Sequence, residues 1–88
     1  MTKHISVKIA GRVQGVGFRF SAYDKFVELG LVGSAENTPD GAVLIKVQGP
    51  EEALSQFVEW CRRGPAGAKV ENVEVGEIAA PFVPLKNG

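Results

Sequence analysis

The spacing of apolar residues constrains the fold of this chain more than any other feature, because it switches repeatedly between two periods. Around residues 4–11, apolar and polar residues alternate, which predicts a half-buried strand. Over about residues 20–29, apolar residues recur at spacings of three and four, which predicts a helix that ends at Gly30. The buried stripe of this predicted helix consists of Phe18, Ala22, Phe26 and Leu29.

The middle of the chain predicts a hairpin. A weak second strand is predicted over about residues 31–37. A third is predicted from Val43 to Val47, where Val43, Ile45 and Val47 alternate with Leu44 and Lys46. Between them lies Thr38-Pro39-Asp40-Gly41, in which proline, aspartate and glycine all suit a tight turn. We therefore expect these two strands to pair.

The last third of the chain predicts a helix and a further strand. The helix opens at Gly49-Pro50-Glu51-Glu52, where proline and acidic residues are favoured, and ends at Arg62-Arg63-Gly64. A fourth strand runs from Val70 or Val73 to Ile78, and residues 81–85 are a candidate edge strand interrupted by prolines. The predicted buried stripe of this helix is Leu54, Phe57, Val58 and Cys61, flanked by Trp60.

The order of these elements is strand, helix, strand, strand, helix, strand. This order is typical of the α+β ferredoxin-like sandwich, βαββαβ, in which two helices lie on one face of an antiparallel sheet. With 88 residues the chain has room for one modest core, so we predict a single domain over residues 1–88. The fold by itself does not indicate a function.

Charge and composition exclude several classes of function. Ten Lys and Arg balance ten Asp and Glu, so the chain lacks the basic face of many nucleic-acid-binding or membrane-surface domains. One cysteine and one histidine allow no internal disulfide and no zinc site built from these residues, so we predict no metal. No stretch resembles a secretory signal or a membrane-spanning helix, and we expect a cytoplasmic protein.

The single histidine and the single cysteine are poor candidates for catalysis. His4 lies at the start of the first predicted strand and is interpreted as a surface histidine. Cys61 lies on the apolar stripe of the second helix and is interpreted as a small buried hydrophobic residue. A nucleophilic cysteine would need an electropositive, partly open site instead.

Residues 14–19, Gln-Gly-Val-Gly-Phe-Arg, are the most informative segment. Gly15 and Gly17 let the backbone approach a ligand closely, and they precede a helix whose free N–H groups attract anions. Arg19 is placed to hold a phosphate through its planar guanidinium. From the residues alone, an anion-binding loop and a glycine-rich turn with a solvated Arg19 are equally consistent. For Asn37, the residues alone favour a role in starting the turn.

The stretch Gly11-Arg12-Val13-Gln14-Gly15-Val16-Gly17-Phe18-Arg19 resembles the signature loop of the acylphosphatases. The resemblance extends over about residues 4–78. The supporting segments are Glu28-Leu29-Gly30-Leu31, Gly33, Asn37-Thr38-Pro39-Asp40-Gly41, Gly49-Pro50-Glu51-Glu52-Ala53, Arg62-Arg63-Gly64-Pro65 and Val70 to Glu77.

This resemblance implies a metal-independent enzyme without a cofactor that hydrolyses acyl phosphates, the mixed anhydrides of a carboxylic acid and phosphate, to carboxylate and inorganic phosphate. In that family the loop arginine binds the phosphoryl group and an asparagine positions the attacking water, roles that fall on Arg19 and Asn37. A small-molecule substrate, inhibition by the product phosphate, a monomer, and no nucleic-acid or membrane partner are expected. The implied phosphate-binding loop is Gln14, Gly15, Val16, Gly17, Phe18 and Arg19.

The chain departs from the family pattern at three places. Ser34 stands where an aromatic residue is usual, and Glu36 stands where a basic or neutral polar residue is usual. The segment 82–88 is short and interrupted by a proline. Because side chains alternate along a strand, Glu36 is predicted to face away from Asn37. Its charge is still expected to weaken the attraction of anions to the site.

Two other functions are compatible with these residues. One is a module that binds an anion without turnover, which steady release of phosphate from acetyl or benzoyl phosphate would exclude. The other is a ferredoxin-like interaction or RNA-binding domain. RNA-binding versions need exposed aromatic residues on the sheet and basic surroundings, whereas the strands here are rich in Val and Ile and the net charge is zero.

Overall fold

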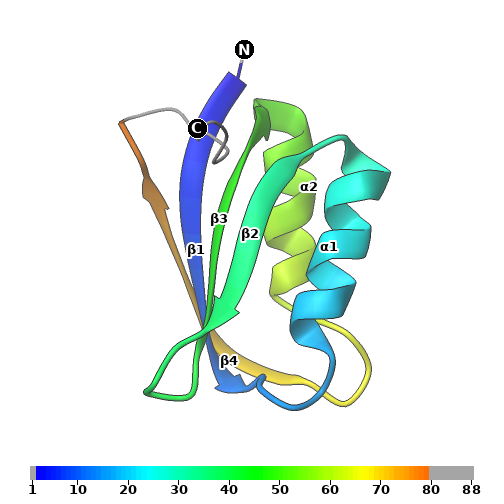
Figure 1. Cartoon of the computed structure of the whole chain (residues 1–88), viewed down its shortest axis with the longest axis vertical. Coiled ribbons are helices and arrows are strands. Elements are labelled where there is room, and N and C mark those ends of the chain that lie inside the picture. The colour runs from blue at the N-terminus through cyan, green and yellow to red at the C-terminus, as the bar shows by residue number, and fades with distance from the viewer. Residues whose placement is uncertain (1, 80–88) are drawn as a thin grey trace, which may run out of the picture.

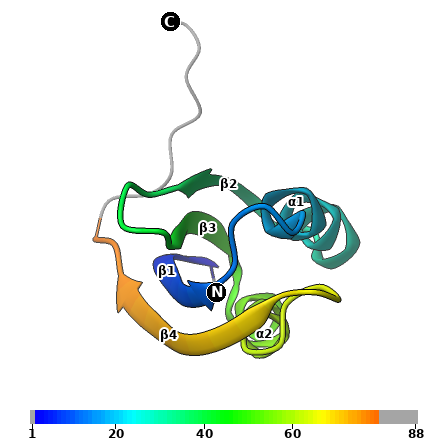
Figure 2. The ribbon, with the colours of Figure 1, turned by 90° about the horizontal axis from the view of Figure 1, so that it is seen from below.

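The computed structural model describes residues 2–79 as four strands and two helices in the predicted order (Figure 1). The strands are β1 (Thr2–Arg12), β2 (Val32–Asn37), β3 (Val43–Pro50) and β4 (Lys69–Glu77), and the helices are α1 (Phe18–Leu29) and α2 (Glu51–Cys61). The sheet is antiparallel with the strand order β2-β3-β1-β4, and both helices lie on one face of it, as the view in Figure 2 shows. The predicted ferredoxin-like α+β fold is therefore confirmed.

Cross-strand pairing explains which side chains enter the core. Residues directly opposite one another in antiparallel strands project from the same face of the sheet. Ala35 of β2 pairs with Ile45 of β3, Ile45 pairs with Val7 of β1, and Val7 pairs with Val75 of β4. The first three are buried beneath the helices, whereas Val75 is 49% exposed at the sheet edge. The helices thus cover β2, β3 and β1 more completely than β4.

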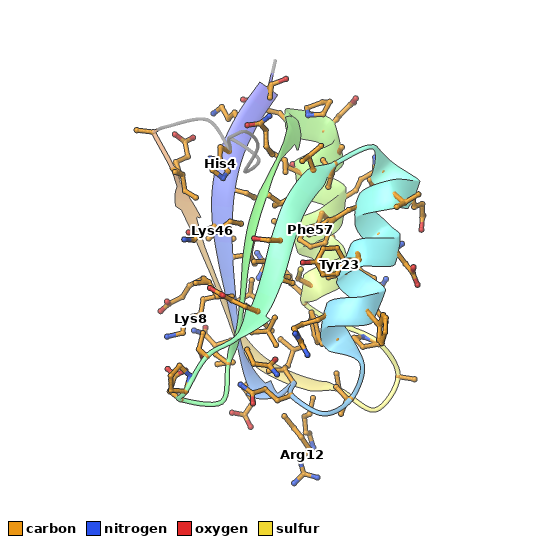
Figure 3. All side chains as sticks on the ribbon, in the orientation of Figure 1. His4, Lys8, Arg12, Tyr23, Lys46 and Phe57 are labelled. Atoms are coloured by element: carbon orange, nitrogen blue, oxygen red, sulfur yellow. The ribbon has the colours of Figure 1, made fainter. Side chains whose placement is uncertain are left out.

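The apolar stripes of both helices meet over this row. Phe18, Ala22 and Phe26 of α1 are buried, as are Leu54, Phe57 and Cys61 of α2, while Leu29, Val58 and Trp60 pack at the margin of the core. The rings of Phe26 and Phe57 lie 5.2 Å apart between centroids, a distance at which aromatic pairs are stabilising. Figure 3 shows Phe57 on the helix side of the sheet. The predicted stripes are confirmed, with Val58 and Leu29 only partly buried.

Element ends differ slightly from the prediction. Helix α1 begins at Phe18, two residues before the predicted start, because Gly17 adopts the left-handed conformation that allows the chain to turn directly into the helix. Strand β1 extends to Arg12 across an irregularity between Ala10 and Gly11. The candidate edge strand at 81–85 lies outside the described residues.

The single cysteine and histidine occupy different environments. Cys61 has no exposed surface, and burial raises the pKa of its thiol to about 12, so its interpretation as a buried hydrophobic residue is confirmed. His4 is half buried on the face of the sheet opposite the helices, so the surface interpretation is only partly right (Figure 3). Within residues 2–79, neither helix has the length and apolar character that a membrane span requires.

Candidate active site

The loop before α1 ends in an open helix N-terminus. Gly15 and Gly17 have φ angles of 76° and 78°, in the left-handed region that favours glycine. A side chain at either position would meet no atom within 4 Å, so backbone conformation rather than crowding accounts for both glycines. The first helical hydrogen bond runs from Ser21 N–H to Gly17 O at 3.0 Å, which leaves the earlier amides of α1 without helical acceptors.

No side chain caps these amides, and the first turn of α1 contains no acidic residue. The positive end of the helix dipole therefore stays open to a negative ligand. Arg19 is the second residue of α1, and its side chain is exposed beside the same amides. Among the described residues Arg19 forms no ion pair with a carboxylate, so its guanidinium keeps its hydrogen-bonding capacity for a ligand.

Asn37 reaches the site from the end of β2. Asn37 pairs with Val43 of β3, and Val43 pairs with Ile9 of β1. Val43 and Ile9 are both buried on the helix side of the sheet. Asn37 therefore projects from that face as well, toward the N-terminus of α1. The neighbouring Glu36 pairs with Leu44 on the opposite face, in the row of Lys8, so its predicted orientation away from Asn37 is confirmed.

A cavity of about 220 Å³ brings these groups together. Of the residues predicted for the site, Gly15, Gly17, Phe18, Arg19 and Asn37 line it, whereas Gln14 and Val16 do not. Two further residues, Val13 and Phe20, complete the lining and were not predicted. The loop, the helix N-terminus and the end of β2 are distant in the sequence but share one hollow.

The side chain of Gln14, which the resemblance includes in the phosphate-binding loop, does not line the cavity. Its side-chain amide donates hydrogen bonds to Thr38 O at 2.9 Å and to Ala42 O at 2.8 Å, both in the hairpin between β2 and β3. These two bonds occupy both amide hydrogens, so the Gln14 side chain has no N–H left for a bound anion. Instead it fixes the distance between the glycine loop and the residues that follow Asn37. Val16 packs against the core.

The hairpin to which Gln14 is bound is itself well braced. Thr38 N–H donates to Ala42 O at 2.9 Å, and Gly41 N–H donates to Thr38 O at 3.1 Å. The Thr38 hydroxyl also hydrogen-bonds to the carboxylate of Asp40, which pairs with Lys8 at 3.0 Å. Chiefly through the Thr38 hydrogen bond, and then through Lys8, the pKa of Asp40 is lowered to about 2. The predicted turn is confirmed, and it holds the end of β2 in place.

A second contact ties α1 to β2. The hydroxyl of Tyr23 accepts a hydrogen bond of 3.1 Å from the backbone N–H of Ala35, which faces outward because β2 is an edge strand. Figure 3 shows the Tyr23 ring between α1 and β2. This contact joins the helix that carries Arg19 to the strand that carries Asn37, two residues beyond Ala35. Together with Gln14, it sets the geometry of the cavity from two sides.

Another cavity is somewhat larger but chemically different. The hollow lined by Lys3, His4 and Glu77 has a volume of about 270 Å³. Lys3 is paired there with Glu51 and Glu77, each at 3.0 Å, and these contacts raise the pKa of its ammonium group. Its positive charge is thus already neutralised. Within residues 2–79, no group of three or more His, Cys, Asp or Glu side chains is arranged to hold a metal ion.

Phe20 and the role of Gln14 were not predicted from the sequence, for different reasons. Phe20 lies off the apolar stripe of α1, and an aromatic residue in that position is a signal that could have identified it. The contacts of Gln14 join residues 24 and 28 positions apart, so no local pattern reveals them.

Known proteins share both the sequence and the fold. The acylphosphatase family model matches residues 5–82. Acylphosphatase from Methylococcus capsulatus is 47% identical over 77 residues, covering 88% of this chain and 84% of that protein. Acylphosphatase from Thermus thermophilus is 54% identical over 67 residues, covering 76% of each chain.

Two solved structures give the same result in three dimensions. An acylphosphatase from Coxiella burnetii superimposes with a TM-score of 0.88 at 35% identity, covering 93% of this chain and 86% of the other. Acylphosphatase from Bacillus subtilis superimposes with a TM-score of 0.86 at 37% identity, covering 92% and 89%. Because the likeness spans most of the sequence and of the fold, including the glycine loop and the end of β2, this chain belongs to the acylphosphatase family.

Proposed function

We propose that this acylphosphatase binds the phosphoryl group of its substrate in the cavity between residues 14–19 and Asn37. Backbone amides at the start of α1 donate hydrogen bonds to the phosphoryl oxygens, and the helix dipole favours their negative charge. The guanidinium of Arg19 adds a planar, two-pronged donor. The observation that carries this proposal is the cavity itself, which contains an arginine with no ion pair among the described residues next to an uncapped helix N-terminus.

In the proposed reaction, Asn37 holds a water molecule by hydrogen bonds so that its oxygen faces the phosphorus atom. A bond forms between this oxygen and phosphorus while the bond from phosphorus to the acyl oxygen breaks. The electron pair of the broken bond leaves with the carboxylate, and a proton of the water passes to a phosphoryl oxygen. The products are a carboxylate and inorganic phosphate, so the atoms and charges balance.

The small set of polar groups in the cavity suits this chemistry. A carboxylate is a stable leaving group, so no strong general acid is needed. Phosphoryl transfer depends mainly on positioning and on stabilising charge on the equatorial oxygens, which amides and an arginine supply. No residue that titrates near neutral pH lines the cavity. We therefore propose a reaction without metal or cofactor whose rate changes little between about pH 5 and 8.

We further propose a cytoplasmic monomer that is inhibited by its product, phosphate, and has no nucleic-acid or membrane partner. A single cysteine suits a reducing compartment. The rows of the open sheet face carry residues such as Ser34, Lys46 and Glu74 rather than aromatic rings. RNA-binding sheets of this type stack bases on such rings, so the alternative of an RNA-binding domain is not favoured.

Gln14 is proposed as a positioning residue, because its amide bonds the glycine loop to the hairpin. In Gln14→Ala, we expect kcat/KM to fall about 10- to 100-fold, since small displacements of reacting groups cost that much. Assays well below the melting temperature, together with phosphate binding, separate this effect from lost stability. Gln56→Ala, on the exposed face of α2, is the matched control and should behave as wild type. Wild-type kcat/KM in folded Gln14→Ala would contradict the positioning role.

The function is tested by a phosphate-release assay with EDTA present throughout. Acetyl phosphate is compared with an aryl phosphate monoester and with ATP. We expect steady turnover of acetyl phosphate in EDTA and much slower phosphate release from the other two compounds. The aryl monoester has a poorer leaving group than a carboxylate, and the hydrolysis of ATP needs a metal ion. Binding without turnover would favour the anion-binding module instead. Loss of activity in EDTA that Mg²⁺ restores would contradict the proposed mechanism.

A further inference from the structure

Phe20 is a large apolar side chain left in an exposed position at the mouth of the cavity. Its side chain is 83% exposed, although it is only the third residue of α1. Exposure alone carries little meaning, because Val27 of the same helix is 84% exposed and does not line this cavity. What sets Phe20 apart is that it lines the same hollow as Arg19 and Asn37.

The lining of the cavity is divided between polar and apolar parts. Arg19, Asn37 and the glycine backbone supply the polar part, where the phosphoryl group is proposed to bind. Val13, Phe18 and Phe20 supply the apolar part, but Val13 and Phe18 are almost fully buried at 1% and 2% exposure. Phe20 is therefore the apolar residue of this lining with most of its surface available to a ligand.

The position of Phe20 relates it to the portion of the substrate that is not phosphate. Arg19 and Phe20 are consecutive residues of α1, and both line the hollow, so a ligand whose phosphoryl group contacts Arg19 occupies a hollow that Phe20 also borders. The acyl group of an acyl phosphate is joined to the phosphoryl group through a single oxygen atom, so it lies next to the phosphoryl group in the same hollow. An aromatic ring attracts another ring through offset or edge-to-face contact and attracts aliphatic groups by burial.

We propose that Phe20 contacts the acyl group and makes this enzyme prefer aromatic or bulky apolar acyl phosphates over acetyl phosphate. This inference rests on the proposed binding of the phosphoryl group in the same cavity. The ring of Phe20 loses exposed surface when such a substrate binds, whereas the methyl group of acetyl phosphate is too small to cover it. Phe20 thereby determines specificity without touching the phosphorus atom.

The experiment compares benzoyl phosphate and acetyl phosphate as substrates of wild type, Phe20→Ala, Phe20→Tyr and Val27→Ala. In Phe20→Ala, kcat/KM for benzoyl phosphate should fall about 3- to 10-fold, mainly through KM, since an aromatic pair of this kind contributes that much. The kcat/KM for acetyl phosphate should fall much less, so the ratio of the two values drops. Phe20→Tyr keeps the ring and should retain the preference. Val27→Ala removes an equally exposed apolar side chain away from the cavity and should change neither substrate.

The outcomes separate this inference from the proposed function. If Phe20→Ala lowers kcat/KM equally for both substrates, or for neither, while wild type hydrolyses both, then Phe20 does not select the acyl group and the inference is overturned alone. If Val27→Ala has the same effect as Phe20→Ala, the contact is not specific and the inference also falls. If wild type hydrolyses neither substrate, the proposed function itself fails and the inference fails with it.

Discussion

Arg19→Ala is expected to lose phosphate affinity and turnover together. Its guanidinium is proposed to contact the phosphoryl oxygens both before and during the reaction, so KM rises and kcat falls. An arginine that stabilises this transition state contributes about 10³- to 10⁵-fold in rate, and we expect kcat/KM to fall within that range. Arg19→Lys should restore little, because an ammonium group cannot reproduce the planar fork. Steady-state kinetics and inhibition by phosphate measure both effects.

Arg12 offers the matched control for this experiment. It carries the same charge at the end of β1, in the same signature loop, but it does not line the cavity. Figure 3 shows its side chain extending away from the body of the molecule. Arg12→Ala should therefore keep wild-type KM and kcat to within about a factor of two, as surface substitutions away from a site do. If Arg12→Ala loses as much activity as Arg19→Ala, general charge attraction rather than a specific contact explains both.

Asn37→Ala is expected to separate binding from turnover. Asn37 is proposed to contact mainly the attacking water, so phosphate binds almost normally while kcat falls by about 10²- to 10³-fold, the usual effect of removing one positioned polar group. KM should change little, which is the kinetic sign of an interaction made in the transition state. Asn72→Ala, an exposed asparagine on β4, is the control and should retain wild-type kcat.

Both asparagine variants need a melting curve first, because Asn37 immediately precedes the hairpin braced by Thr38 and Asp40. If Asn37→Ala is folded and keeps wild-type kcat, Asn37 does not position the water. If its kcat falls but its phosphate affinity falls equally, Asn37 contacts the phosphoryl group instead. Arg19→Ala and Asn37→Ala together therefore distinguish the two proposed roles, because only Arg19→Ala should weaken phosphate binding.

Much of the fold follows from local patterns in the sequence. Alternation in β1 and β3 identifies the side chains that enter the core, and the spacing of Phe18, Ala22 and Phe26 identifies the buried face of α1. The pattern is less informative for β4, where Val75 alternates as a core residue but is half exposed. Alternation reports which face of the sheet a side chain occupies, whereas the depth of burial depends on how far the helices reach over an edge strand.

The site was predictable only where the chemistry is local. Gly15, Gly17 and Arg19 follow one another in a single loop, so their residue types already indicate an anion-binding helix N-terminus. The placement of Asn37 depended on family resemblance until the pairing of β2 with β3 put it on the helix side. The bonds from Gln14 to the hairpin depend on tertiary structure and escaped prediction entirely.

The three departures from the family pattern differ in how they relate to the cavity. Glu36 faces the side of the sheet opposite the cavity, so its charge acts on the site only across the sheet and through solvent. Ser34 is exposed on the same strand. The segment 82–88 lies outside the described residues. Neither Ser34 nor Glu36 is among the described residues that line the cavity.

The most direct test of the account is a titration with inorganic phosphate followed by two-dimensional ¹H–¹⁵N NMR of the whole protein. We predict the largest shifts at the backbone amides of residues 15–19 and at the Asn37 side chain, with saturation at a single site. The same titration of Arg19→Ala should show these shifts strongly reduced, while Asn37→Ala should keep those of the loop. The largest shifts around Lys3, His4 and Glu77, with none in the glycine loop, would contradict the account.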